Sequence, residues 1–144
     1  MQEQTVDVRA AELAAWYGET AGPTAAQWRR VLSGPQGAPI TLINFFKLRA
    51  VVRDGDGASS GMDAMMRYAA VSGPTLVKVG GRFLLTGAFE ATFMGEDEDW
   101  DLVAIAAYPD RAALFALLDD DAYRAAWADR VAAVERQRVV VAAG

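Results

Sequence analysis

The sequence contains no cysteine and no histidine among its 144 residues. The missing cysteines exclude disulfide bonds, zinc–thiolate centres, iron–sulfur clusters and cysteine nucleophiles. The missing histidines exclude a Ser-His-Asp triad, a histidine-ligated haem or zinc ion, and an imidazole general base. Any acid–base chemistry in this protein must therefore use Asp, Glu, Lys, Tyr, Arg or water.

Basic clusters and long apolar runs are also missing. The 14 lysine and arginine residues are scattered, and the net charge is −5, which argues against nucleic acid and against anionic membranes as partners. No apolar stretch reaches the roughly 18 residues of a membrane span. The first residues lack a basic flank followed by an apolar run, so they do not form a signal peptide. We therefore expect a cytoplasmic protein with no nucleic-acid or membrane partner.

The apolar fraction of 53% is typical of a folded chain, and 144 residues suit one domain with a single core. Two short helices are expected near the N-terminus, the first in "DVRAAELAAWYG" and the second opened by Pro23 and Thr24 and ended by Gly34. We interpret residues 1–38 as a helical extension of the same domain, and residues 39–144 as its main part.

The main part alternates strand and helix patterns in the order β-α-β-β-α-β, which predicts an α+β fold of the ferredoxin-like type. The segment "RDGDGASSG" is expected to be a loop, and Gly73-Pro74 predicts a kink or a restart within the first helix. The second helical region is expected to be split in two. The predicted strands cover residues 40–48, 82–93, 101–108 and 136–142, and the predicted helices cover residues 62–79, 111–118 and 121–135.

Runs of acidic residues occur in two places, and neither has the spacing of a metal site. Asp119, Asp120 and Asp121 precede "AYRAAW", where an aspartate is expected to cap the start of a helix. Residues 96–99, "EDED", lie between two predicted strands and are expected to form a solvated turn. Neither run has the alternating acids, central glycine and terminal glutamate of a calcium-binding loop. We therefore predict no metal site.

Polar residues inside the strands are the candidates for chemistry. Asn44 interrupts an apolar run, so it must form hydrogen bonds within the fold or line a cavity. Strand alternation places Asn44 and Phe46 on one face of the first strand, and Arg82, Thr86 and Glu90 on one face of the second. Tyr108 shares its face with two alanines, which would leave a pocket or receive a helix.

Three segments resemble a known family: "INFFKLR", "GMDAMMRYAAVSGPTLVKVGGRFLLTG" and "WDLVAIAAYPDRAALFALLDDDAYRAAWADRVAAVE". The order and spacing of Gly80-Gly81-Arg82, Trp100-Asp101, Tyr108-Pro109, Tyr123 and Arg130 carry this resemblance. Over about residues 39–142 the chain resembles the domain-of-unknown-function 1330 family, within the dimeric α+β barrel superfamily. The resemblance implies a four-stranded antiparallel sheet with helices on one face, and a homodimer that pairs sheet to sheet. Family members often carry a histidine before the last arginine, where this chain has Asp129.

The superfamily includes cofactor-free enzymes that act on aromatic or polyketide substrates. By this resemblance we expect a cofactor-independent isomerase or cyclase acting on a small apolar or aromatic metabolite between sheet and helices. A cofactor-free monooxygenase and a non-catalytic ligand-binding or dimerisation module remain alternatives. Arg82 or Asn44 would polarise a carbonyl, Tyr108 or Tyr68 would donate a proton, and Glu90 would be the base. The candidate substrate contacts are Tyr68, Phe46, Met65, Trp100, Tyr123 and Arg130.

Overall fold

The computed structural model describes residues 2–54 and 57–144. The chain forms two compact units, one ending at Gly37 and the other beginning at Ala38, and each is described by itself. The N-terminal unit contains the helices α1 (Gln2–Tyr17) and α2 (Ala25–Leu32), as the sequence predicts.

A capping box fixes the start of α2. The Thr24 hydroxyl accepts a hydrogen bond from the Gln27 backbone N–H at 3.2 Å, and the Gln27 side-chain oxygen accepts one from the Thr24 backbone N–H at 2.9 Å. Two backbone donors that the helix cannot pair internally are satisfied in this way. The rings of Tyr17 and Trp28, both buried, lie 5.6 Å apart between centroids and join the two helices.

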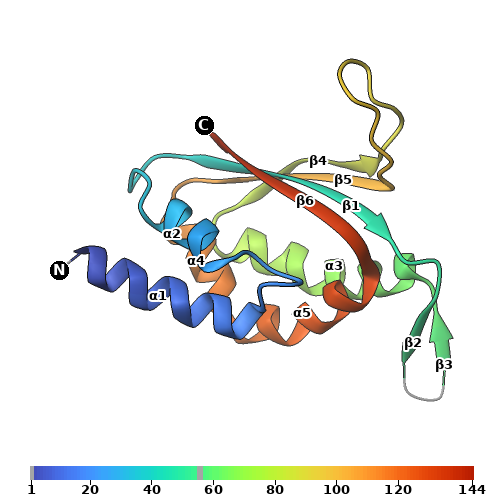
Figure 1. Cartoon of the computed structure of the whole chain (residues 1–144), viewed down its shortest axis with the longest axis horizontal. Coiled ribbons are helices and arrows are strands. Elements are labelled where there is room, and N and C mark those ends of the chain that lie inside the picture. The colour runs from blue at the N-terminus through green and yellow to red at the C-terminus, as the bar shows by residue number, and fades with distance from the viewer. Residues whose placement is uncertain (1, 55–56) are drawn as a thin grey trace. The chain divides into compact units, whose positions relative to one another are not determined.

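The second unit is built on a four-stranded antiparallel sheet in the order β4-β5-β1-β6. Figure 1 shows α3 and α5 beneath one face of this sheet, which agrees with the predicted ferredoxin-like architecture. The strands of the sheet are β1 (Ile40–Leu48), β4 (Arg82–Ala88), β5 (Leu102–Tyr108) and β6 (Val134–Ala143). The helices are α3 (Gly61–Lys78), α4 (Arg111–Asp119) and α5 (Asp121–Ala133).

The register of the strands defines two faces of the sheet. Asn44 of β1 lies opposite Ala104 of β5 and Val139 of β6, and Phe46 lies opposite Gln137. Because paired residues share a face, these residues belong to the face that α3 and α5 cover, which we call the inner face. The opposite, outer face carries a row of apolar residues across all four strands: Leu85, Ile105, Ile43 and Val140.

A register shift in β4 changes the faces predicted for that strand. Arg82 lies opposite Ala107 and Phe83 opposite Ala106, but the next paired residue is Leu85, opposite Ile105. One extra residue therefore lies between two paired positions, as in a β-bulge, and side-chain alternation is interrupted there. The prediction that Arg82 shares a face with Thr86 is wrong, since Thr86 lies opposite Ala104 on the inner face.

Three further segments differ from the prediction in detail. β4 ends at Ala88 and not at residue 93, so residues 89–101 form a long loop between β4 and β5. The predicted loop at residues 53–61 contains most of a small hairpin of β2 (Val52–Asp54) and β3 (Gly57–Ser59), whose residues 55–56 lie outside the described part of the chain. α3 continues through Pro74 without a restart, and the Thr75 hydroxyl donates to the Val71 carbonyl at 2.8 Å.

The end of β1, the start of α3 and the end of α5 meet at Arg49. The Arg49 backbone N–H donates to the Ala133 carbonyl, and the Arg49 carbonyl accepts from the Gly61 N–H, each at 2.8 Å. The Arg49 guanidinium also donates to the Val131 and Ala132 carbonyls at 2.7 and 2.9 Å. These bonds satisfy carbonyls that the last turn of α5 leaves unpaired, and they hold α3 and α5 at fixed positions under the sheet.

Candidate functional site

Five polar side chains meet between the inner face and the helices, and we call them the Arg130 cluster. Their elements are far apart in the sequence: β1, α3, α5 and β6. Tyr123 and Arg130 lie two turns apart on α5, so they project from the same side of that helix. The members of the cluster are Asn44, Tyr68, Tyr123, Arg130 and Gln137.

Hydrogen bonds connect these side chains through the guanidinium of Arg130. Its Nη1 donates to the Tyr68 hydroxyl at 3.0 Å, and that hydroxyl lies 2.6 Å from the Tyr123 hydroxyl. Its Nε and Nη2 both donate to the amide oxygen of Gln137, at 3.2 and 2.9 Å. Nη2 also lies 3.5 Å from the Asn44 amide oxygen, at the long limit for a hydrogen bond.

Aromatic rings surround the same guanidinium. The Arg130 Cζ atom lies 4.8 Å from the ring centroid of Phe46, 5.1 Å from that of Trp127 and 5.5 Å from that of Tyr68. Each ring face attracts a cation within about 6 Å. Arg130 also lies in the last turn of α5, where the helix dipole favours positive charge. These contacts stabilise a buried cation, but none of them neutralises its charge.

No carboxylate pairs with Arg130 among the residues that the structure describes, and every side chain that it contacts is neutral. Burial by itself would lower the pKa of Arg130, but the interactions with Tyr68 and Tyr123 raise the pKa above its ordinary value. The guanidinium therefore stays charged. A buried charge without a counter-ion is costly, and it is the most unusual feature of the described structure.

Tyr108 lies on the inner face at the end of β5 and is only 5% exposed. Its hydroxyl forms no hydrogen bond with any residue of the described chain, unlike those of Tyr68 and Tyr123. Burial raises the pKa of Tyr108; the nearby Tyr68 raises it further, and the positive charge of Arg130 opposes both effects. The phenol is therefore protonated over the physiological range.

The predicted substrate contacts Tyr68, Tyr123 and Arg130 lie together in the cluster, and Phe46 packs against its guanidinium. Met65 is buried one turn before Tyr68 on α3. Asn44 takes the first of the two roles considered for it, hydrogen bonding within the fold: its amide N–H donates to the Ala104 carbonyl at 3.0 Å, and its oxygen faces Arg130.

Arg82 and Glu90 lie apart from these residues. Arg82 is exposed and its register places it on the outer face, whereas Asn44 and Tyr108 are on the inner face. Glu90 is exposed and follows the end of β4, in the loop of residues 89–101. Since a catalytic group must reach the atom on which it acts, neither side chain belongs to the site that the cluster defines.

Trp100 is buried on the outer face. Its ring lies 5.8 Å from that of Phe45, and the Arg136 guanidinium lies 4.2 Å from its centroid. Phe45 and Arg136 are outer-face residues by register, since Phe45 pairs with Val103 and Arg136 with Lys47. Trp100 therefore anchors the loop before β5 and does not line the Arg130 cluster.

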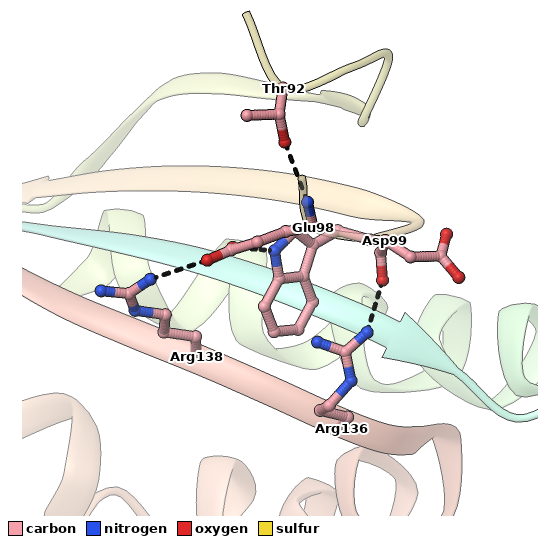
Figure 2. A network of polar contacts seen from close by, with 6 residues as sticks. Thr92, Glu98, Asp99, Arg136 and Arg138 are labelled. Atoms are coloured by element: carbon pink, nitrogen blue, oxygen red, sulfur yellow. Dashed lines mark hydrogen bonds and ion pairs between the residues drawn. The ribbon is translucent and has the colours of Figure 1, made fainter. Parts of the chain in front are cut away.

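The acidic loop before Trp100 is tied to the sheet through several contacts, which Figure 2 shows. Glu98 pairs with Arg138 at 3.1 Å, and the Asp99 carbonyl accepts from Arg136 at 2.7 Å. The Thr92 hydroxyl accepts from the Glu98 N–H at 3.1 Å, and Asp99 pairs with Lys47 at 3.0 Å. The sequence predicts only a solvated turn here, but these acids also hold the loop against the arginines of β6.

The three consecutive aspartates act at helix ends, as the sequence predicts. Asp120 caps α5 by accepting from the Tyr123 N–H at 3.0 Å, and it pairs with Lys78. Asp119 pairs with Arg124 at 3.2 Å, and Asp121 lies in the first turn of α5. Asp129, where family members often carry a histidine, pairs with Arg67 at the surface and not with the cluster.

Two features of the described residues concern metals and membranes. No group of three or more acidic residues has the geometry to hold a metal ion within that part of the chain. Of its helices, none is both long and apolar enough to cross a bilayer.

Sequence reasoning missed Gln137 and Trp127. Gln137 stands between Arg136 and Arg138 in β6, and strand alternation alone would have placed it on the face opposite to both arginines. Trp127 lies one turn from Tyr123 and nearly one turn from Arg130 on α5, which was a signal that it belongs with them.

The sheet order and the helices on its inner face place this protein in the ferredoxin-like α+β class. The model of the domain of unknown function DUF1330 matches residues 58–144, and the chain belongs to this family. The match begins after β1, later than the resemblance at residues 39–142 that the sequence suggests. No curated protein matches the chain.

Solved structures of similar proteins carry the same fold. The RPA0582 protein of unknown function from Rhodopseudomonas palustris is 33% identical, with a TM-score of 0.78 over 86% of this chain and 95% of that chain. A methylated form of RPA0582 gives the same identity and TM-score over 93% of its chain. A dimeric protein of unknown function with a ferredoxin-like fold, from Bacteroides fragilis, is 14% identical, with a TM-score of 0.50 over 76% of this chain and all of that chain.

Proposed function

We propose that this protein is a cofactor-independent isomerase or cyclase that acts on a small apolar or aromatic metabolite carrying a carbonyl group. The observation that carries the proposal is the buried guanidinium of Arg130, hydrogen-bonded to Tyr68 and surrounded by rings, without a carboxylate partner in the described chain. Buried ionisable groups that the fold itself does not neutralise are typical of functional sites.

The cluster contains the groups that such a reaction needs. Arg130 would polarise the carbonyl oxygen of the substrate, because a fixed cation in a region of low dielectric stabilises the negative charge that develops there. The paired hydroxyls of Tyr68 and Tyr123 form a short chain along which a proton moves, and Tyr108 provides a further phenol. A water molecule would take a proton from one carbon, and a proton would return through the tyrosine hydroxyls to another carbon of the same molecule. Substrate and product are then isomers, and no cofactor is consumed.

A non-catalytic ligand-binding module is the second candidate. Among the described residues, no carboxylate belongs to the cluster, so phenols and water are the only groups there that can accept a proton. Because these are weak bases, this composition favours binding without catalysis. Under this alternative the same residues bind a small molecule and leave it unchanged.

Native mass spectrometry followed by deuterium exchange separates the two candidates. The protein as purified is analysed for a retained small molecule, and that compound is then incubated in D₂O with the protein. An isomerase or cyclase incorporates deuterium at the carbon next to the carbonyl or converts the compound to an isomer. Arg130→Met is expected to lose this activity, and the matched control Arg82→Met, on the outer face, is expected to keep it. Retention of a compound without exchange in the wild type would support the binding module.

We also propose that the protein works as a homodimer that pairs through the outer faces of two sheets. The ends of the apolar row on that face are exposed in the part of the chain that the structure describes: Leu85 is 51% exposed and Val140 is 37% exposed. The loop of residues 89–101 lies on the same side in Figure 1 and presents Phe93 and Met94, which are 96% and 84% exposed. Exposed apolar surface of this extent is typical of an interface, and the Bacteroides fragilis protein of the same fold is described as dimeric.

A further inference from the structure

We propose that Arg130 binds an oxyanion of the ligand, a carboxylate or an enolate, at the position that the amide oxygen of Gln137 occupies in this structure. The inference rests on the proposed function, since it assigns a chemical class to the ligand of the same site. It goes further in naming the charged group of the ligand, the atoms that receive it and the side chain that must move.

The Arg130 cluster carries one positive charge and no negative charge, which favours binding of an anion. Arg130 donates to the Tyr68 hydroxyl, which is hydrogen-bonded to that of Tyr123, and to two amide oxygens. Its guanidinium also lies near three ring faces, and all of these groups are neutral. Neutral acceptors and ring faces offset part of the desolvation cost of a buried cation, whereas a paired anion offsets much more. A ligand that supplies one negative oxygen therefore gains more from this site than a neutral ligand of the same shape.

The geometry of Gln137 marks where that oxygen would lie. Its amide oxygen accepts from both Nε and Nη2 of Arg130, at 3.2 and 2.9 Å. These two N–H groups form one edge of the guanidinium fork, the type of edge that binds carboxylates in proteins. The amide oxygen carries only a partial charge, so it holds the place of an anion without neutralising the cation.

Gln137 is also well placed to move aside. It lies on β6, which is an edge strand of the sheet, and its side chain is half-buried, whereas Tyr68 and Tyr123 are buried. Rotation of a glutamine side chain at a sheet edge requires no change in the backbone ladder. A ligand that enters at Gln137 would reach the Arg130 guanidinium without displacing the tyrosines.

The number of donors and the surroundings limit the ligand further. The rings of Phe46, Tyr68 and Trp127 surround the guanidinium. Lys47, which follows Phe46 on β1, pairs with Asp99 and Asp101 and is not part of the Arg130 cluster. A phosphate can also pair with such a fork, but its remaining charged oxygens would then face aromatic rings and not further cations. One oxyanion on a flat, apolar skeleton fits the cluster better, and an aromatic carboxylate or an enolate has that chemistry.

Isothermal titration calorimetry with benzoate and benzamide tests the inference. The two probes share a ring and differ in charge, so wild-type protein should bind benzoate at least tenfold more tightly than benzamide. Arg130→Met should abolish this preference. Gln137→Glu should also abolish it, because an internal carboxylate then occupies the guanidinium edge. Arg82→Met, the outer-face control, should leave the preference unchanged.

Equal affinity for the two probes, or a benzoate preference that survives in folded Gln137→Glu, would overturn the inference, and so would a failure of benzoate to bind. Gln137→Glu keeps the test decisive if Arg130→Met fails to fold, since the exchange changes one atom and retains the acceptor. The proposed function is judged separately by deuterium exchange, which does not depend on benzoate. Exchange without a benzoate preference would retain the enzyme and reject the oxyanion, whereas a preference without exchange would indicate a binding protein for anions.

Discussion

The hydroxyls of Tyr68 and Tyr123 lie 2.6 Å apart, although the two residues are 55 positions apart in the sequence. Their rings meet edge to face at a centroid distance of 5.8 Å. The contact joins α3 to α5, and through Tyr68 it joins both helices to Arg130. It follows that the stability of the fold and the position of the guanidinium depend on the same pair of hydroxyls.

Replacing each buried tyrosine by phenylalanine should show which hydroxyls stabilise the fold. Tyr68→Phe should lower the free energy of unfolding by about 1.5–3 kcal/mol, because it removes a hydrogen bond from a charged donor, and Tyr123→Phe by about 1 kcal/mol. Tyr108→Phe should leave stability unchanged or raise it, since the Tyr108 hydroxyl has no partner in the described chain. Urea unfolding monitored by circular dichroism measures all three, and a loss of more than about 1 kcal/mol in Tyr108→Phe would show a bond that the structure lacks.

Tyr108 should also influence stability at alkaline pH. Burial raises the pKa of its phenol in the folded state above the value of about 10 expected in the unfolded chain. The contribution of this group to stability is therefore complete below about pH 10 and is lost as the pH rises toward the folded-state pKa. Urea unfolding between neutral and alkaline pH should show a shallower decline in Tyr108→Phe than in the wild type, and parallel declines would contradict this.

Asp120 should make the free energy of unfolding decrease at acidic pH. The hydrogen bond from the Tyr123 N–H, followed by the pairing with Lys78, lowers the pKa of this carboxyl in the folded state. Its contribution is present above the ordinary carboxyl pKa and is lost as the pH falls through the lowered folded-state value. Asp120→Asn retains a capping residue but cannot titrate, so its unfolding midpoint in urea should fall less steeply below about pH 4 than that of the wild type. Identical acid profiles would assign the titration to other carboxyls.

Gly61 should tolerate no side chain. A methyl group added there would collide with the Arg49 carbonyl oxygen and would lie 2.7 Å from the Arg49 backbone nitrogen and 2.9 Å from the Ala133 oxygen. Since these atoms belong to the backbone, Gly61→Ala should lower the free energy of unfolding by about 3 kcal/mol or more. Gly73→Ala is the matched control on the same helix, with no atom within 4 Å of the added group. It should change stability by less than about 1 kcal/mol, as helix propensity and the following proline oppose each other.

The outer face should control the oligomeric state. Leu85→Glu places a charge in the apolar row and should convert a dimer to a monomer in sedimentation velocity experiments, because an unpaired charge inside an interface is costly. Met66→Glu on α3 is the matched control, since Met66 is 52% exposed and Leu85 is 51% exposed. It should sediment as the wild type does. A wild-type monomer, or a dimer that Leu85→Glu leaves intact, would reject sheet-to-sheet pairing.

Much of the fold follows from local patterns in the sequence. The apolar run at residues 40–48 and the caps at Thr24 and Asp120 lie where the sequence predicts them. Strand alternation failed in β4, because the register shift between Phe83 and Leu85 depends on pairing with β5, which no local pattern reveals. The end of β4 at Ala88 also depends on pairing, since the ladder with β5 stops at Ala88 and Leu102 although the residues beyond it have strand-like composition.

The candidate site was predictable only in part. Tyr123 and Arg130 are among the residues that carry the family resemblance, and Tyr68 was predicted separately as a substrate contact. The structure brings the three side chains together. The choice of Arg82 over Arg130 as the polarising group could not be checked from the sequence, because both are arginines beside apolar residues. Only tertiary packing distinguishes them. Arg82 is exposed on the outer face, whereas Arg130 is buried and pairs with no carboxylate of the described chain.

The central claim is that Arg130 serves a ligand and is not a brace for the fold. Urea unfolding of Arg130→Met tests it most directly, since methionine fills similar space without the charge. Tyr68 retains Tyr123 as a partner, and Gln137 is half-buried and can turn to solvent. The account predicts a free energy of unfolding equal to or above that of the wild type, because a costly buried charge is removed. A loss of about 3 kcal/mol or more would show that the guanidinium stabilises the fold, and it would contradict the account.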